Sequence, residues 1–497
     1  MNLKSSFSWR AVSWVFILIF FGKITGFIRE LYISYEFGAS KSTDAYFVAS
    51  NIPNLLFLSI IGSLLAFVIP KIEEIKSKGL SIDNFVNSFI SIVLVLSLSL
   101  SLIGTICADF IIELIAPGFN EETKNYAVEL SRILVWSFPF SSLCLILAYI
   151  SSTFGKLFSQ HLIPVTSNIL VVLGIILFAD KYGIKIVAIA GVLAILIQLI
   201  VQILLSRQYL EVKLNFDLLN KDNRHIIVLA IPFFLTNSLE QINSFVNTYI
   251  ASEFIVGSVS HLNYAQKVQL TLNSTISLAI ITVSYPLLSR FYYSFDKQEF
   301  YTILQRTLDV VVLSTSLITL ILIVYGYEFI NFIFLRGNFT QKDVEITSQI
   351  FIYYSLGILS ISIREILLRI YLIRKDAKTP LIISAITIII NIFLSILLVE
   401  KFGIKSMAIA NSVSILMNLI VMIYFLPEIK KLNFSEILKK TVIPVVCSGF
   451  IVLCFKNFFT ATINPVLGAG LISIILFVFL LFFQNPLLLM IKAKLNG

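Results

Sequence analysis

Apolar runs of about 20 residues recur from one end of this chain to the other. A run of that length crosses a hydrocarbon core of about 30 Å as an α-helix. The strands of an outer-membrane barrel are shorter and alternate in polarity, so the runs exclude that architecture. With 58% hydrophobic and 13% charged residues, the composition also excludes an ordinary soluble globule. The predicted fold class is an all-α polytopic membrane protein.

The apolar runs predict fourteen transmembrane helices. The first run is interpreted as a retained helix because it lacks a small-residue cleavage site and continues into a charged stretch. The predicted spans are 9–37, 43–70, 82–112, 125–152, 161–179, 184–206, 224–252, 260–290, 300–330, 343–373, 379–399, 404–426, 440–457 and 465–490.

Lysine and arginine are distributed unequally between the two sets of predicted loops. Of the 37, 21 lie on the side of the chain termini and nine on the opposite side. Cytoplasmic loops carry the excess of these residues, so we expect both termini on the cytoplasmic side of the membrane. The same loop bias explains the net charge of +9, which otherwise could suggest nucleic-acid binding.

An internal repeat divides the chain. DKYGIK at 180–185, followed by AIA, recurs 220 residues later as EKFGIK at 400–405, again followed by AIA. A weaker echo at an offset of 216 pairs Pro70 with Pro286 and Pro164 with Pro380. Repeats of six helices share one orientation and enclose a central cavity in many transporters. We therefore expect an N-lobe at 1–206, a cytoplasmic linker at 207–223, a C-lobe at 224–427 and two terminal helices at 428–497.

Charged residues within the predicted spans are the main functional signal. A charge at the bilayer centre costs about 2.5 to 3.5 kcal/mol on insertion scales, so such residues face protein, water or substrate. An excess of cations favours an anion, and Arg and Lys together suit a phosphate or diphosphate. The candidate cavity residues are Lys23, Arg29, Glu30, Asp44, Arg132 and Lys267, with Arg364 and Arg369 as further candidates.

Buried salt bridges are the alternative for three of these cations. Arg132 is three residues from Glu129 on one helix face, and Arg364 is next to Glu365. On the first helix, Lys23 and Glu30 are seven residues apart and share a face, while Arg29 lies about a quarter-turn away. One carboxylate therefore cannot easily neutralise both cations.

Other polar residues carry weaker signals. Asn243, Asn247 and Asn391 are candidate cation ligands, although hydrogen bonding between helices explains them as well. His161, His225 and His261 fit packing at span ends better than a proton relay. The sequence contains neither a nucleotide-binding GxxxxGK[ST] loop nor a catalytic constellation, which favours a carrier over an enzyme and predicts no nucleotide, metal or cofactor.

Several motifs resemble the MurJ/MviN lipid II flippases of the multidrug/oligosaccharidyl-lipid/polysaccharide exporter superfamily. The resemblance covers nearly the whole chain. Its motifs are GFIRELYISYEFGAS at 26–40, KSTDAYFVA at 41–49, IPNLL at 52–56, APGF at 116–119, LNYAQK at 262–267, RGNF at 336–339, and REILLRIY with KDAKTP at 364–380.

The resemblance implies matched positions for six candidate residues. Lys23, Arg29, Glu30 and Asp44 match family positions in the first two helices, and Arg132 and Lys267 match cationic positions in the fourth and eighth. Lys23, Glu30 and Lys267 stand where Arg, Asp and Arg are common in the family. Gln266 replaces a usual acid, and Phe57 and Leu58 replace paired arginines. These departures keep the sign of the cavity but lower its charge.

The function implied is transport of lipid II, an undecaprenyl-diphosphate-linked glycan, to the outer leaflet by alternating access. Membrane lipids and cell-wall synthesis proteins are the other expected partners, and the membrane potential or a monovalent cation is the expected driving force. A flippase for another undecaprenyl-linked glycan is the first alternative. A cation-coupled multidrug exporter would need an acidic cavity, and a membrane scaffold would have no reason to keep cations in its spans.

Overall fold

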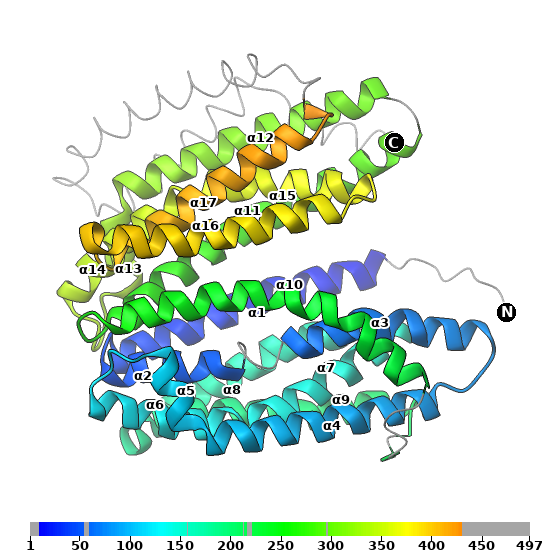
Figure 1. Ribbon diagram of the computed structural model, residues 1–497, viewed down its shortest axis with the longest axis horizontal. Coiled ribbons are helices and arrows are strands. Elements are labelled where there is room, and N and C mark those ends of the chain that lie inside the picture. Colours follow the sequence, from blue (N-terminus) through cyan, green and yellow to red (C-terminus); the bar gives the residue numbers. More distant parts are fainter. Residues whose placement is uncertain are drawn as a thin grey trace. The chain divides into compact units, whose positions relative to one another are not determined.

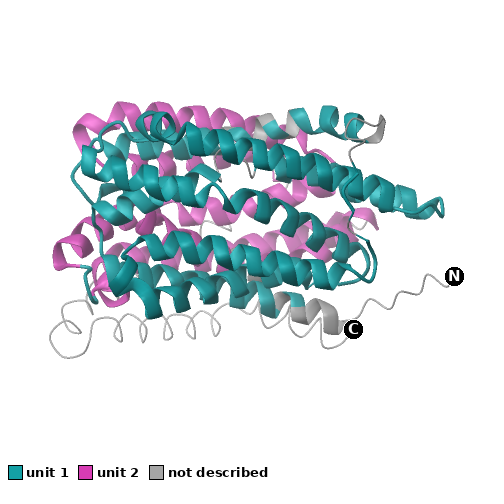
Figure 2. Ribbon diagram, turned by 90° about the horizontal axis from the view of Figure 1, so that it is seen from below, with its two compact units in different colours: residues 1–260, 336–339 teal, residues 261–335, 340–497 magenta. Residues whose placement is uncertain are grey.

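The computed structural model describes residues 9–53, 59–156, 158–211, 213–215, 221–294 and 297–429. The predicted spans 440–457 and 465–490 lie outside these ranges. All regular elements within them are helices, which form two compact units (Figures 1 and 2). Unit 1 comprises Met1–Ser260 and Arg336–Phe339, and unit 2 comprises His261–Leu335 and Thr340–Gly497.

Unit 1 contains ten helices in the described ranges. They are α1 (Trp9–Phe37), α2 (Lys41–Pro53), α3 (Ser59–Ser77), α4 (Asp83–Ile106), α5 (Ala108–Ile115), α6 (Glu121–Leu134), α7 (Ser137–Thr153), α8 (Ser159–Tyr182), α9 (Lys185–Ser206) and α10 (Lys221–Ser252). Helix α10 packs along α3 and also contacts α4 and α5, so unit 1 extends past the polar segment 207–223. The division into an N-lobe and a C-lobe at 207–223, which rests on the sequence repeat, stays a prediction.

Unit 2 contains most of α11 and the six helices that follow it. They are α11 (Ser258–Tyr293), α12 (Lys297–Val324), α13 (Gly326–Phe334), α14 (Gln341–Ser355), α15 (Ile358–Ile373), α16 (Lys378–Phe402) and α17 (Lys405–Phe425). Its buried apolar core is built by side chains of α11, α12, α15, α16 and α17.

Seven helical segments in the described part of the chain are long and apolar enough to cross a membrane. Several of them present apolar side chains to their surroundings rather than to protein. Only 17% of the most apolar window of α16 is buried, and Phe393, Ile396 and Leu397 are exposed. Water would penalise such a surface at about 25 cal/mol per Å², whereas lipid tails do not. The polytopic all-α membrane fold is therefore confirmed.

Four predicted spans are interrupted, and the interruptions occupy equivalent places in the two halves. Spans 82–112 and 125–152 are broken at Cys107 and at 135–136, and spans 300–330 and 343–373 are broken at Tyr325 and at 356–357. The predicted spans do not mark these breaks because the apolar pattern runs through them.

The helices that follow the two short elements begin with a matched cap. Asn120 caps α6 by accepting a hydrogen bond from Thr123 N, and Thr340 caps α14 by accepting one from Asp343 N. The two caps are 220 residues apart, which is the offset of the sequence repeat.

The repeated DKYGIK and EKFGIK motifs form the same helix–turn–helix. Gly183 ends α8 at φ 56°, ψ −148°, and Gly403 ends α16 at φ 58°, ψ −140°. Each donates its backbone N–H 2.8 Å to a carbonyl four residues earlier. Glycine adopts this region readily because it lacks a Cβ. The repeat seen in the sequence is thus a repeat of structure.

Polar pairs inside the two helix hairpins extend the repeat. Thr166 donates to Gln198 Oε1 at 2.6 Å between α8 and α9. Between α16 and α17, Asn418 donates to Thr387 Oγ1 at 2.8 Å. Gln198 and Asn418 are again 220 residues apart. In lipid, where apolar burial does not drive association, such hydrogen bonds help to hold helices together.

Candidate functional site

The site centres on Arg29 of α1. Its guanidinium donates from Nη2 to Glu30 Oε1 at 2.7 Å and from Nη1 to Asn168 Oδ1 of α8 at 3.0 Å. Glu30 is 4% exposed and Asn168 is 7% exposed. Burial suits these groups only because they are paired, since an isolated charge would lose its hydration. Asn168 is missing from the sequence-based candidates because nothing in the sequence shows which helix faces α1.

Lys23 lies six residues, or about one and two-thirds turns, before Arg29 on α1. It is partly exposed and forms no ion pair within the described ranges. We expected Glu30 to share a face with Lys23 and to lie away from Arg29; the structure corrects this, because Glu30 binds its sequence neighbour Arg29. The conclusion that one carboxylate does not neutralise both cations is kept, and Lys23 supplies the excess positive charge.

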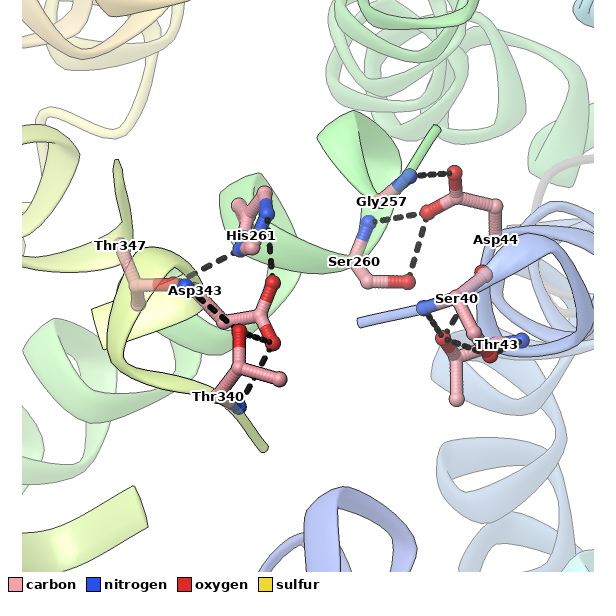
Figure 3. Close-up of polar contacts among 9 residues, drawn as sticks. All are labelled: Ser40, Thr43, Asp44, Gly257, Ser260, His261, Thr340, Asp343 and Thr347. Atoms are coloured by element: carbon pink, nitrogen blue, oxygen red, sulfur yellow. Dashed lines mark hydrogen bonds and ion pairs between the residues drawn. The ribbon is translucent and has the colours of Figure 1, made fainter. Parts of the chain in front are cut away.

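Asp44 of α2 binds backbone N–H groups of the same unit. Its carboxylate accepts hydrogen bonds from Gly257 N at 2.6 Å, Ser260 N at 2.7 Å and Ser260 Oγ at 2.6 Å (Figure 3). The side chain therefore caps the first turn of α11, and its negative charge interacts favourably with the positive end of that helix dipole. Asp44 is 3% exposed and both its oxygens are occupied. This geometry favours a structural role over the predicted role in the cavity.

Asp44→Ala should lower the free energy of unfolding by about 3 kcal/mol or more, because three donors lose a charged acceptor in a buried place. Ser260→Ala removes only the hydrogen bond from Ser260 Oγ, so it should lower the free energy of unfolding clearly less. Thermal denaturation of the purified protein measures both, and binding of a prenyl diphosphate to the folded fraction should be unchanged. Lost binding at an unchanged denaturation midpoint would return Asp44 to the substrate site.

Arg132 of α6 pairs with a different partner from the one expected. Its Nη2 lies 2.7 Å from Asp109 Oδ2 of α5, and the two side chains are 50% and 60% exposed. Glu129, the expected partner, instead lies 2.5 Å from Lys185 Nζ of α9. The break at Cys107 is the physical reason, because it lets α5 pack on α6 and brings Asp109 to Arg132.

The remaining cationic candidates lie in unit 2. Arg364 of α15 donates from Nη2 to Glu365 Oε1 at 3.1 Å, which is the pair that the salt-bridge alternative names, although both side chains are partly exposed. Arg369 is partly buried on the same helix, and its Nε has no hydrogen-bond partner in the described ranges. Lys267 is partly buried on α11. Its cavity role, like those of Arg364 and Arg369, stays a prediction.

The asparagine candidates are divided between the units. Asn243 and Asn247 lie on α10 of unit 1, and Asn391 lies on α16 of unit 2. Asn391 donates to Ser414 Oγ of α17 at 3.0 Å, so its amide does join two helices. Within the described ranges no group of three or more His, Cys, Asp or Glu side chains could hold a metal ion.

A second polar cluster, in unit 2, was missed by sequence reasoning. His261 Nδ1 lies 2.9 Å from Thr347 Oγ1, and its Nε2 lies 3.5 Å from Asp343 Oδ1 (Figure 3). Asp343 Oδ2 accepts from Thr340 N at 2.8 Å and from Thr340 Oγ1 at 2.7 Å, forming a capping box. Thr340 and Asp343 are spaced as a capping box in the sequence and could have been found. His261 is 1% exposed, which agrees with a packing role.

Comparison with known proteins decides the family. A family model described as lipid II flippase MurJ matches residues 33–480, most of the chain. The chain belongs to the MurJ family. Similar relatives are described as probable lipid II flippase MurJ: one from Aquifex aeolicus is 27% identical, covering 95% of this chain and 94% of the relative, and one from Buchnera aphidicola subsp. Baizongia pistaciae is 26% identical, covering 84% of each.

Solved structures give the same result. A structure described as lipid II flippase MurJ in the inward closed conformation has a TM-score of 0.81 and 28% identity, and the match covers 95% of this chain and 99% of that one. An inward-facing multidrug MATE transporter has a TM-score of 0.60 at 13% identity. At that identity the likeness shows a common fold alone. The MurJ family is a transporter family, and this member is a multi-pass membrane protein.

Proposed function

We propose that this MurJ family member moves lipid II from the cytoplasmic to the outer leaflet of the bacterial inner membrane. The supporting observation lies in the middle of α1, where the only carboxylate near Lys23 and Arg29 along the helix is Glu30, which pairs with Arg29; Arg10 and Glu36 lie near the helix ends. An excess cation at membrane depth is expensive unless an anion meets it. A lipid-linked diphosphate is an anion whose prenyl tail stays in the bilayer while the phosphates and sugar bind protein.

The membrane potential is the proposed driving force. Moving about two negative charges outward is favoured by roughly 4 to 5 kcal/mol at an inside-negative potential of 100 mV. After release, the net positive site is drawn back toward the cytoplasmic side. The Lys and Arg bias of the loops supports this orientation, with both termini cytoplasmic. The proposal requires neither a nucleotide nor a catalytic group.

Transport of purified lipid II in proteoliposomes tests the proposal. An imposed inside-negative potential should speed transport at least tenfold, and a protonophore with a potassium ionophore should abolish the increase. Unchanged transport without a potential would disprove the electrical account. Transport of another undecaprenyl-diphosphate glycan in preference to lipid II would keep the proposed mechanism and change the proposed substrate.

Cell-wall synthesis proteins are the other proposed partners, and cross-linking in membranes tests whether they bind this protein.

A further inference from the structure

Asn168 of α8 connects two helices at the proposed anion site. Its Oδ1 accepts the hydrogen bond from Arg29 Nη1 at 3.0 Å. Its Nδ2 points back to α1, 3.4 Å from Gly22 O and 3.5 Å from Thr25 Oγ1. The amide thus faces both the backbone of α1 and the guanidinium that α1 carries. The buried Asn168 side chain therefore ties the Arg29 guanidinium to α8.

Two glycines of α1 leave room for this contact. A Cβ on Gly26 would lie 3.3 Å from Asn168 Nδ2, closer than most real Cβ contacts. One turn earlier, a Cβ on Gly22 would lie 3.5 Å from Pro164 Cβ, an ordinary van der Waals distance. Of these two glycines, Gly26 therefore has less room for a side chain, and Asn168 is the residue that limits it.

The chemistry of the amide is suited to orienting a cation without cancelling its charge. A guanidinium has five N–H donors, and Glu30 and Asn168 each engage one in this structure. Of the other three, the Nε–H is buried, which leaves one N–H on each of Nη1 and Nη2 to meet an anion. Asparagine accepts one hydrogen bond as a neutral group, whereas a carboxylate at the same place would compete with the anion for Arg29.

We propose that Asn168 is a positioning residue that holds the Arg29 guanidinium in the orientation that binds the diphosphate. The inference rests on the proposed function, because the role of Arg29 as an anion ligand is part of that function. It adds a residue from α8 to a site otherwise built from α1.

Binding of farnesyl diphosphate to the full-length protein in nanodiscs tests the inference. Asn168→Leu, which removes the acceptor, should weaken binding about tenfold, as expected for one hydrogen bond to a charged group. Asn168→Asp should keep the fold and still weaken binding, because a second carboxylate then holds Arg29. Thr166→Val is the matched control: it removes a hydrogen bond of α8 to α9 that does not involve Arg29, and binding should stay within twofold.

A double-mutant cycle separates positioning from packing. In the Arg29→Gln background, Asn168→Leu should cause no further loss of binding. An equal loss in both backgrounds, or wild-type binding by Asn168→Leu, would overturn the inference while leaving the proposed function intact. Wild-type binding by Arg29→Gln itself would overturn the proposed anion site, and with it the inference.

A steric pair gives an independent measurement. Gly26→Ala should push the Asn168 amide away from its place and weaken farnesyl diphosphate binding several-fold, whereas Gly22→Ala should leave it unchanged. Equal binding by the two variants would contradict the inference, since only the first added methyl group meets Asn168.

Discussion

Arg29→Ala is expected to abolish complementation of a flippase-depleted strain and to lower lipid II transport in proteoliposomes about 30-fold or more. The guanidinium is paired with buried Glu30, and truncating one partner of a buried, hydrogen-bonded charge pair costs about 2 to 5 kcal/mol. Most of the loss is expected in substrate binding. Without Arg29, the Glu30 carboxylate is no longer neutralised and repels the incoming diphosphate.

Two controls accompany the Arg29 experiment. Size-exclusion profiles of the variant should show folded protein, and Lys124→Ala should complement normally, because its pair with Glu113 is at the surface, where solvent screens such pairs and they contribute little to stability. Arg29→Ala/Glu30→Gln removes both charges and should still fail. Normal growth of the single variant would remove Arg29 from the substrate site.

Gly337→Ala is expected to cause the largest loss of stability. Gly337 has φ 58°, and a Cβ there would lie 2.2 Å from the carbonyl oxygen of Tyr35, an atom of the α1 backbone. Backbone cannot move aside as a side-chain end can, so the segment 336–339 must leave its place. That movement would also break the hydrogen bond of 2.8 Å from Asn338 N to Tyr35 O.

Gly79→Ala is the matched control for this substitution. Gly79 also has a positive φ, of 70°, but nothing lies within 4 Å of an added Cβ. The variant therefore has the same kind of backbone strain, of about 1 to 2 kcal/mol, without a clash. Thermal midpoints of the two purified variants should differ clearly, with Gly337→Ala lower. Similar midpoints would mean that the 336–339 segment contributes little to the stability of unit 1.

Local sequence patterns were sufficient for the bounds of some helices. The first span was predicted at 9–37 and is found at Trp9–Phe37, and span 184–206 differs from α9 by one residue. Hydropathy determines these bounds because a helix in lipid must satisfy its own backbone and offer apolar side chains. The breaks at Cys107 and Tyr325 were missed, since both lie in apolar sequence and are decided by packing of the short helices α5 and α13.

The partners of charged residues could not be predicted in the same way. Arg364 and Glu365 are adjacent, so their pairing was visible locally. For Arg132 the salt-bridge alternative named Glu129 on the same helix, but Asp109 of another helix is its partner. Asp44 stood out as a charge in a predicted span, yet only the fold shows that it caps residues more than 200 positions away.

The sequence by itself determined the membrane class, the duplication and the sign of the charge on the first helix, because each follows from residue type and spacing along one chain. Only the tertiary structure decided which polar atoms meet. Glu30 binds Arg29 rather than Lys23, and Asn168 reaches the same guanidinium from 139 residues away. The sequence pattern shows which residues share a face of a helix, but only the packing of the helices determines which neighbour that face contacts.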